Sequence, residues 1–549
     1  MQLIKILCGC GQKYAFEVEP ADGRLECAVC CPVCGADGRE AANAAMEQPF
    51  GHVSAPSPGL RIAAAKPPPA LSAPERAQRA ESPPSRFSAE PKVRSLSLGL
   101  AIGGVALAAL LCSVAFTSSL WRKQTPTQAP MDGYPRTLKD LDASYATPAA
   151  DQNAATSYLR GFNLLRLGGP GPISGAPIFG KGKFPSCGAP LQASVKTGVA
   201  ALVKANEEAC RFFEEGSAHD QCRYPVDLNL GAWALTPHTS KLRSAVQLIG
   251  LTALFHAEAQ DGKRAVQDIM TGLALTRSLE AEPILISQLV RVTSVSFCVA
   301  SWEQTANRAV APGESLTNLL GAFQRMEDSE ARGEGFTRAI AAERAIWLAL
   351  LETPDKLLQL LTAPGADLAP ELRGRLEARL HAAGTYKEEK NEIESIFQEL
   401  LEARKASFPD RLRTEALIQQ RVTEAARRKL AILEAILPGI ATVSSREAES
   451  QAQLRLGVTA VALELFRAAH DQRYPAALAE LAPALLASPP QDPFDGQPLR
   501  YALKAGGYLL YSIGPDLRDD LGERPTGKTG DLVFEVVSPV KLAALRESR

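Results

Sequence analysis

The chain has 549 residues, of which 46% are apolar and 22% are charged. This length is too great for one ordinary core and predicts two to four domains, while the composition excludes a mostly disordered or fibrous protein. Sixty basic and 61 acidic side chains leave a formal charge of −1, which gives no electrostatic reason to expect a nucleic acid as partner.

Six of the eleven cysteines lie within the first 34 residues, in close pairs around a short β-prone stretch. Two thiolates from each of two pairs can converge on one tetrahedral zinc ion. The second pair could be Cys27 and Cys30, but we prefer the pair that precedes Gly35, because glycine lets the backbone amides turn toward sulfur. The alternative to zinc is a disulfide-linked domain. The zinc ligands that we predict are Cys8, Cys10, Cys31 and Cys34.

This cysteine pattern resembles the bacterial N-terminal zinc ribbons of the form CxCG…CPxCG, over residues 1–35. The resemblance implies a structural zinc rather than a catalytic one, since four thiolates leave no open position for water. A domain this small has almost no core, so the metal would supply most of its folding free energy. We therefore expect a zinc ribbon at residues 1–45.

An uncharged segment follows a long tether. Residues 46–94 include nine prolines between Gly51 and Arg94 and show no apolar periodicity, which indicates a disordered linker. Residues 95–121 carry no charge and would extend about 40 Å as a helix, more than the roughly 30 Å of bilayer hydrocarbon. Trp121 followed by two basic residues is typical of an interfacial anchor. The segment predicts one transmembrane helix, with a buried soluble helix as the alternative.

The orientation in the membrane depends on the cysteines, because positive charges flank both ends of the segment almost equally. A thiolate zinc site persists best in a reducing cytosol. We therefore expect a bacterial inner-membrane protein with residues 1–94 in the cytoplasm and residues 124–549 outside it. Four further cysteines would then face an oxidising space, and a disulfide between Cys210 and Cys222 is the first candidate, with unpaired burial as the alternative. These four are Cys187, Cys210, Cys222 and Cys298.

Residues 135–445 are predicted to be mainly helical, as a bundle or an irregular array. Short turns such as Asp261-Gly262 make neighbouring helices antiparallel, and this hairpin is like a tetratricopeptide unit, although no fixed period is found. The glycine- and proline-rich stretch 168–190 is expected to be a loop. Apolar residues recur at helical spacing in three successive stretches, 241–260, 263–280 and 284–303.

Charged residues in this region are interpreted as solvated helix faces with weak side-chain pairs. This interpretation applies to Glu343 and Arg344 and to the stretch 387–428, which is dense in both charge signs. Lone His256 on an apolar helix is interpreted as a packed residue.

The composition changes again near residue 446. Alternating apolar residues and aromatic content indicate β structure after a long helix. We expect a helix at 447–471, a short helix at 477–481 and strands at 499–503, 508–512 and 531–537. Four motifs follow one another here: Asp-Pro-Phe-Asp-Gly at 492–496, Leu-Arg-Tyr at 499–501, Tyr-Ser-Ile-Gly-Pro-Asp at 511–516 and Gly-Asp-Leu at 530–532.

The order of these motifs resembles the globular part of the major pseudopilin of type II secretion systems, and implies an α+β module at residues 446–540. In that family the loop after the Ser-x-Gly-x-Asp strand binds calcium through hard oxygen ligands. A pseudopilin's membrane helix runs directly into this module, whereas here residues 122–445 separate the two. The calcium ligands that the resemblance implies are Asp516, the best matched, with Asp519, Asp520 and Asp531. Without the resemblance, Asp516, Asp519 and Asp520 are interpreted as turn formers and solvent-facing charges.

Taken together, we expect a multidomain, mainly α-helical, non-enzymatic single-pass envelope protein that binds a protein partner or acts as a scaffold. Its layout resembles that of bacterial single-pass membrane proteins, and this likeness implies no known activity. One alternative is a component of a secretion or pilus-like assembly, supported by the C-terminal module. A second alternative is a hydrolase, which a deep pocket gathering Glu343, Arg344 or His256 with shifted titration would favour.

Overall fold

The computed structural model describes residues 2–7, 13–18, 133–167, 184–361, 368–381, 387–524 and 529–537. The predicted zinc ligands, the linker and the predicted membrane helix at 95–121 lie outside these ranges. The chain divides into two compact units. The first contains strands β1 (Gln2–Leu7) and β2 (Lys13–Val18), which pair antiparallel with Gln2 opposite Val18.

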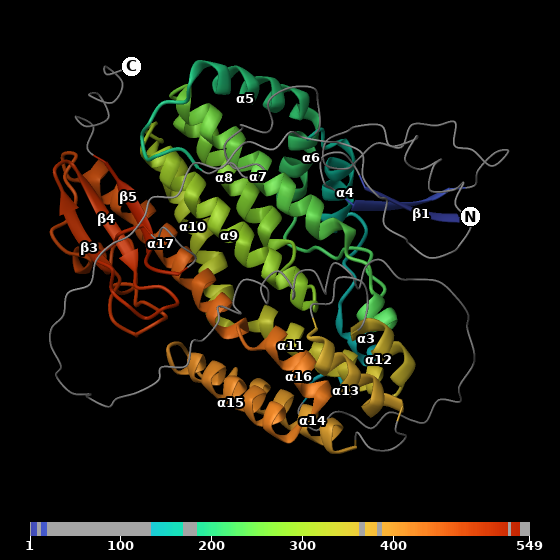
Figure 1. The fold of residues 1–549 in the computed structure, drawn as a ribbon. Helices are drawn as coiled ribbons and strands as arrows, with labels where there is room; N and C mark the ends of the chain where they lie inside the picture. Colours follow the sequence, from blue (N-terminus) through green and yellow to red (C-terminus); the bar gives the residue numbers. More distant parts are fainter. Residues whose placement is uncertain are drawn as a thin grey trace, which may run out of the picture. The chain divides into compact units, whose positions relative to one another are not determined.

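The second unit is mainly helical and is built around long helices that pack side by side (Figure 1). Apolar side chains of these helices form one continuous hydrophobic core. The helices predicted at 241–260, 263–280 and 284–303 are confirmed to within a few residues. The core helices are α7 (Pro237–Glu258), α8 (Gly262–Arg277), α9 (Leu285–Ala306), α10 (Gly313–Arg332) and α17 (Val443–Ala469).

The turn between α7 and α8 has the chemistry that its sequence predicts. The Asp261 side chain accepts a hydrogen bond of 3.0 Å from the backbone N–H of Arg264 and so caps α8. Glycine is required at position 262, because a Cβ there would lie 2.3 Å from the carbonyl oxygen of Val310. The α7–α8 hairpin can therefore pack closely against the segment after α9.

A group of shorter helices surrounds these core helices at the beginning of the unit. They are α3 (Leu138–Ser144), α4 (Ala155–Leu164), α5 (Ala193–Ala205), α6 (Glu207–Ser217) and the 3₁₀-helix η2 (Leu228–Trp233).

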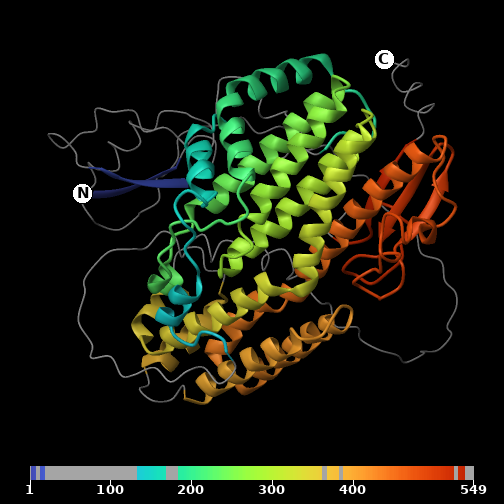
Figure 2. The same cartoon turned by 180° about the vertical axis from the view of Figure 1, so that it is seen from behind.

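A second hydrophobic core lies among the helices between α10 and α17 (Figure 2). It joins the first core where α11 packs on α9. The helices of this second core are α11 (Glu334–Leu351), α12 (Pro354–Leu361), α13 (Pro370–His381), α14 (Lys387–Ala403), η3 (Asp410–Leu412), α15 (Arg413–Arg428) and α16 (Ala431–Ile440).

The C-terminal strands form an antiparallel sheet in the order β3-β4-β5, which confirms the three strands predicted there. Leu510 of the central strand lies opposite Tyr501 on one side and Phe534 on the other. The sheet packs on α17 and shares the first hydrophobic core with the bundle. The strands are β3 (Arg500–Lys504), β4 (Gly507–Ser512) and β5 (Leu532–Val536), and the short helix before them is the 3₁₀-helix η4 (Leu478–Leu481).

One of the described helices, α9, is long and apolar enough to cross a membrane. In the structure α9 packs against α7, α8, α11 and α17, and 56% of its apolar window is buried inside the protein. Its apolar character is therefore explained by its central place in the bundle.

The four described cysteines are all unpaired, so the disulfide proposed between Cys210 and Cys222 is wrong and the alternative of unpaired thiols is correct. Each side chain packs among different neighbours: Cys210 lies near Thr252, whereas Cys222 lies near Tyr224 and Ser278. Burial raises the pKa of both thiols to about 12, which keeps them protonated and unreactive at neutral pH.

Candidate functional site

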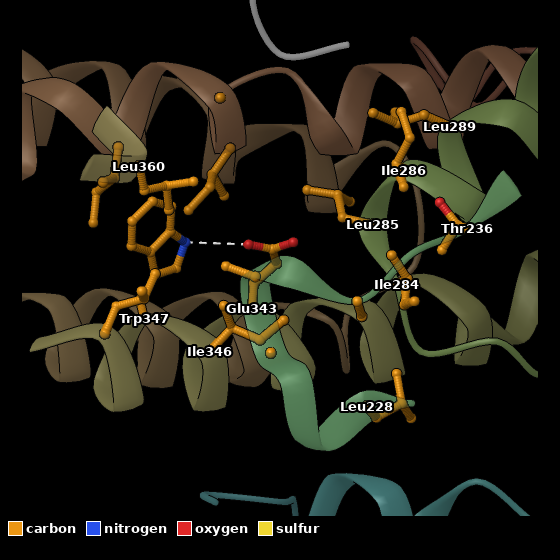
Figure 3. A pocket seen from close by; sticks show the side chains of 17 residues that line it. Leu228, Thr236, Ile284, Leu285, Ile286, Leu289, Glu343, Ile346, Trp347 and Leu360 are labelled. Atoms are coloured by element: carbon orange, nitrogen blue, oxygen red, sulfur yellow. Dashed lines mark hydrogen bonds between the residues drawn. The ribbon is translucent and has the colours of Figure 1, made fainter. Parts of the chain in front are cut away.

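A mainly apolar cavity in the helical unit is lined by one face of α11. Glu343, Ile346, Trp347 and Leu350 follow at spacings of three and four residues, so their side chains project from the same side of the helix. Three of the four are apolar, and the fourth is a glutamate. The α11 face therefore places a single carboxyl group in an otherwise apolar wall (Figure 3).

Four other elements complete the cavity, which has a volume of about 120 Å³, and one of them is α12, which contributes Leu360. The beginning of α9 contributes Leu285 and Leu289, the end of α16 contributes Ile436 and Gly439, and the segment from Leu228 to Thr236 closes another side. Figure 3 shows Ile284, Ile286 and Leu289 grouped on the side away from Trp347. All of these contributions except Thr236 are apolar, and Glu343 is the one titratable residue in the described lining.

The segment across the cavity bends at Gly231. This residue has φ 56° and ψ −122°, a conformation that interrupts η2 and suits glycine. Gly231 and Ala232 line the cavity, while Leu230 and Leu235 of the same segment are 46% and 43% exposed. Exposed leucines therefore lie next to lining residues along this edge of the cavity.

Glu343 is held by one hydrogen bond within the described structure. The indole Nε1 of Trp347 donates to Glu343 Oε2 at 3.1 Å, as Figure 3 shows. Burial raises the pKa of Glu343 from 4.5 to about 7, although the Trp347 hydrogen bond acts in the opposite direction. A pKa near 7 means that the carboxyl is poised between its neutral and ionised forms at physiological pH.

The interpretation of Glu343 and Arg344 as a solvated pair is wrong. Arg344 is completely buried and donates to the carbonyl oxygens of Tyr134 and Pro135, each at 3.3 Å. Of the two residues, only Glu343 lines the cavity. His256 is elsewhere, on α7, with its Nδ1 2.6 Å from Asp268 Oδ2. Of Glu343, Arg344 and His256, the three residues considered for a hydrolase site, the cavity contains only Glu343.

The four aspartates implied as calcium ligands lie in and beside one loop, where three of them accept hydrogen bonds. Asp516 accepts from the backbone N–H of Arg518 at 3.3 Å, and Asp519 from that of Leu521 at 2.9 Å. Asp531 accepts from Gly522 at 2.7 Å. Within the described ranges no group of three or more His, Cys, Asp or Glu is arranged to hold a metal, and residues 525–528 of this loop lie outside those ranges.

Several charged residues in 387–428 are buried, so the expectation of a solvated face is wrong for them. Arg404 and Arg411 both bind Glu447 of α17, and Arg411 Nη1 is 2.8 Å from Glu447 Oε1. Glu389 is fully buried and pairs with Arg379 at 2.8 Å. These charges serve the packing of α13, α14, η3 and α17 rather than contact with water.

A second buried group contains residue types found in hydrolases, but its geometry differs from theirs. His238 Nε2 lies 2.9 Å from Glu282 Oε2, and Ser287 Oγ donates to Glu282 Oε1 at 2.5 Å. Both side chains therefore bind the carboxylate. A serine nucleophile would instead have to donate to the histidine, so this cluster is a buried structural network.

Comparison of the chain with protein-family models, with curated proteins and with solved structures found no match. The geometry of the Glu343 cavity therefore carries the functional argument.

Proposed function

We propose that the helical unit is a binding domain that takes an apolar group into the Glu343 cavity. The observation that carries this proposal is the lining, which is apolar apart from Thr236, the Trp347 indole N–H and one carboxyl. Ligand sites in proteins typically combine a hydrophobic wall with a few polar groups that fix orientation. The cavity is comparable with an engineered cavity of about 150 Å³ that accepts benzene.

Binding fits this geometry better than hydrolysis does. A hydrolase needs a nucleophile with a general base, or two acid–base groups that act together. The described lining brings one carboxyl, and the group that contacts it is an indole N–H. A carboxyl with a hydrogen-bond donor is suited to orienting a ligand.

The binding domain would belong to a single-pass envelope protein. We propose that residues 95–121 span the membrane, that a zinc ribbon lies on the cytosolic side and that residues 124–549 lie outside the cytoplasm. The uncharged stretch and the clustered cysteines support this arrangement. Protease added to intact spheroplasts should digest the chain beyond residue 124, and protection of that region would contradict the orientation.

A larger side chain at the rim of the cavity tests whether ligands enter it. Gly439 lies at the exposed rim of the cavity, and a Cβ placed there has no atom within 4 Å, so the side chain of Gly439→Leu can be accommodated and should obstruct the opening. Gly374 on α13 is also open within 4 Å and does not line the cavity, which makes Gly374→Leu a matched control. Both changes replace glycine in a helix and should not lower helix stability.

The readout is photolabelling of the full-length protein in lipid nanodiscs by octanol that carries a diazirine. Wild type and Gly374→Leu should be labelled on peptides of α9, α11 and α16, and Gly439→Leu should lose most of this labelling. Equal labelling of these peptides in all three proteins, or none in wild type, would contradict the proposed function.

A further inference from the structure

We propose that the cavity selects a primary ammonium carrying an apolar group, whose charge pairs with the Glu343 carboxylate while the apolar group fills the cavity. This inference rests on the proposed binding function and identifies the class of ligand. It depends on a contrast between Glu343, which is partly buried and faces the cavity, and the six buried glutamates of the same unit.

In the described structure six glutamates are buried, and each of them pairs with the side chain of an arginine or a histidine. Five of them pair with arginine, and Glu282 pairs with His238 at 2.9 Å. This pattern is expected, because a buried carboxylate without a partner is costly. The arginine-paired residues are Glu303 with Arg524, Glu330 with Arg291, Glu389 with Arg379, Glu447 with Arg404 and Arg411, and Glu464 with Arg467.

Glu343 departs from this pattern. Its described partner is the neutral indole of Trp347, and no charged side chain stands beside it in the cavity lining. The hydrogen bond from Trp347 reaches Oε2, which leaves acceptor capacity on the other oxygen. Figure 3 shows the carboxyl group projecting into the space between Trp347 and Leu285. A cation that enters the cavity would therefore supply Glu343 with the kind of partner that the protein provides to its six buried glutamates.

The size and composition of the cavity further restrict the class of ligand that can bind. A compact ammonium has three donors and needs less room than a planar guanidinium, so it leaves more of the cavity of about 120 Å³ for carbon atoms. An anionic ligand would be repelled by the Glu343 carboxylate. A longer hydrocarbon could continue along the segment that exposes Leu230 and Leu235.

The test is a competition against diazirine-octanol labelling of the full-length chain in nanodiscs at pH 8, where Glu343 is mostly ionised. The competitors are octylamine, octanol and octanoate, which share their chain length and differ in the head group, and empty nanodiscs correct for lipid partitioning. Octylamine should displace the label at about one tenth of the octanol concentration, the gain expected for a charge-assisted hydrogen bond. Octanoate should be the weakest competitor.

The variant that isolates the charge is Glu343→Gln, which keeps an oxygen acceptor for Trp347 and the size of the side chain. It should retain labelling by diazirine-octanol but bind octylamine and octanol equally well, within about twofold. Glu352→Gln is the matched control, because Glu352 follows α11 directly and its side chain is 63% exposed and paired with Lys390. Glu352→Gln should keep the tenfold preference for the amine.

The outcomes separate the two proposals. Equal competition by octylamine and octanol in wild type would overturn the ammonium proposal and leave the binding function standing. An amine preference that persists in Glu343→Gln would also overturn it, because another group would then recognise the charge. Failure of Gly439→Leu to reduce labelling in the same assay would remove the binding function itself. Melting curves of Glu343→Gln and Gly439→Leu in the absence of ligand show whether each variant is folded.

Discussion

Ser512 Oγ lies 2.9 Å from Asp492 Oδ1, although twenty residues separate them in the chain. The same carboxylate accepts backbone N–H groups of Phe494 and Ile513 at 3.0 and 2.9 Å, and it pairs with Arg500 at 3.0 Å. Asp492 therefore ties the Asp-Pro-Phe-Asp-Gly loop to the end of β4. Two of the motifs that carry the pseudopilin resemblance are joined by this one buried side chain.

Replacing Asp492 should destabilise the C-terminal sheet strongly. Asp492→Ala leaves two backbone donors, a hydroxyl and an arginine without their acceptor, and should lower the free energy of unfolding by about 3–5 kcal/mol. Asp495→Ala is the control, because Asp495 is more exposed and pairs with the same Arg500, and it should cost about 1 kcal/mol. Denaturant unfolding monitored through hydrogen exchange in β4 measures the loss of stability in both variants. Similar small losses in the two variants would contradict the role of Asp492.

Local patterns predicted the elements of this region correctly. The alternation around Tyr508 and Leu510 indicated the central strand, and these residues are indeed in β4. The helical spacing in 241–260, 263–280 and 284–303 was equally local, because it requires only that each helix has an apolar side. Cavities and ion pairs depend on which helices meet, and this information is spread along the chain.

The buried charges show the difference. The sequence alone places Arg404 and Arg411 on a solvated face, because the stretch around them is rich in both charge signs. Their partner Glu447 is 43 and 36 residues away, so spacing along one helix could not reveal it. For Glu343 a weak signal was present, since it is an isolated acid in the apolar stretch 339–351 apart from its neighbour Arg344. The sequence could not show which of the two faces a cavity.

The Glu447 cluster predicts a second large stability effect. Glu447→Ala leaves Arg404 and Arg411 buried without their carboxylate, and we expect a loss of about 3–5 kcal/mol in the free energy of unfolding. Glu449 lies on the same helix and pairs with Arg446 nearer the surface, so Glu449→Ala should cost less than about 1 kcal/mol. Chemical denaturation of the two variants beside wild type tests this. A loss below 1 kcal/mol for Glu447→Ala would show that the cluster is not required for packing.

Zinc should be present at about one ion per chain, because four convergent thiolates form a closed tetrahedral site. Elemental analysis of the purified full-length protein measures this ratio. Changing Cys31 and Cys34 together to serine should remove the metal, whereas changing Cys27 and Cys30 should leave it in place. The reverse result would assign the second ligand pair to Cys27 and Cys30, and zinc-free wild type would contradict the ribbon.

Calcium should raise the melting temperature of the protein if the loop around Asp516 binds it, since a ligand of the folded state stabilises that state. The loop already orients Asp519 and Asp531 through backbone N–H groups, and carboxylates retain acceptor capacity for a cation. Asp516→Ala should abolish the shift, while Asp151→Ala, at an exposed position before α4, should preserve it. Calorimetry with and without millimolar calcium decides the question, and an unchanged wild-type melting temperature counts against this site.

The pKa of Glu343 predicts a specific pH dependence of stability. The folded-state pKa of about 7 exceeds the unfolded value of 4.5, so between these values the folded protein keeps a proton that the unfolded chain releases. The contribution of Glu343 to stability therefore decreases as pH rises from about 4.5 to 7, and it is constant outside that window. The full effect is no more than about 3 kcal/mol, and water entering the cavity makes it smaller.

Unfolding of wild type and Glu343→Gln across pH 4 to 8 measures this contribution as a difference. The comparison is needed because Glu415, whose pKa burial also raises to about 7, contributes with the same sign in both proteins. Glu343→Gln should gain stability relative to wild type above pH 7. Octylamine should bind wild type more tightly as pH rises through 7, because ionised Glu343 is the form that pairs with an ammonium. A stability difference that does not vary with pH would place the pKa of Glu343 near its ordinary value and remove the electrostatic basis for amine selection.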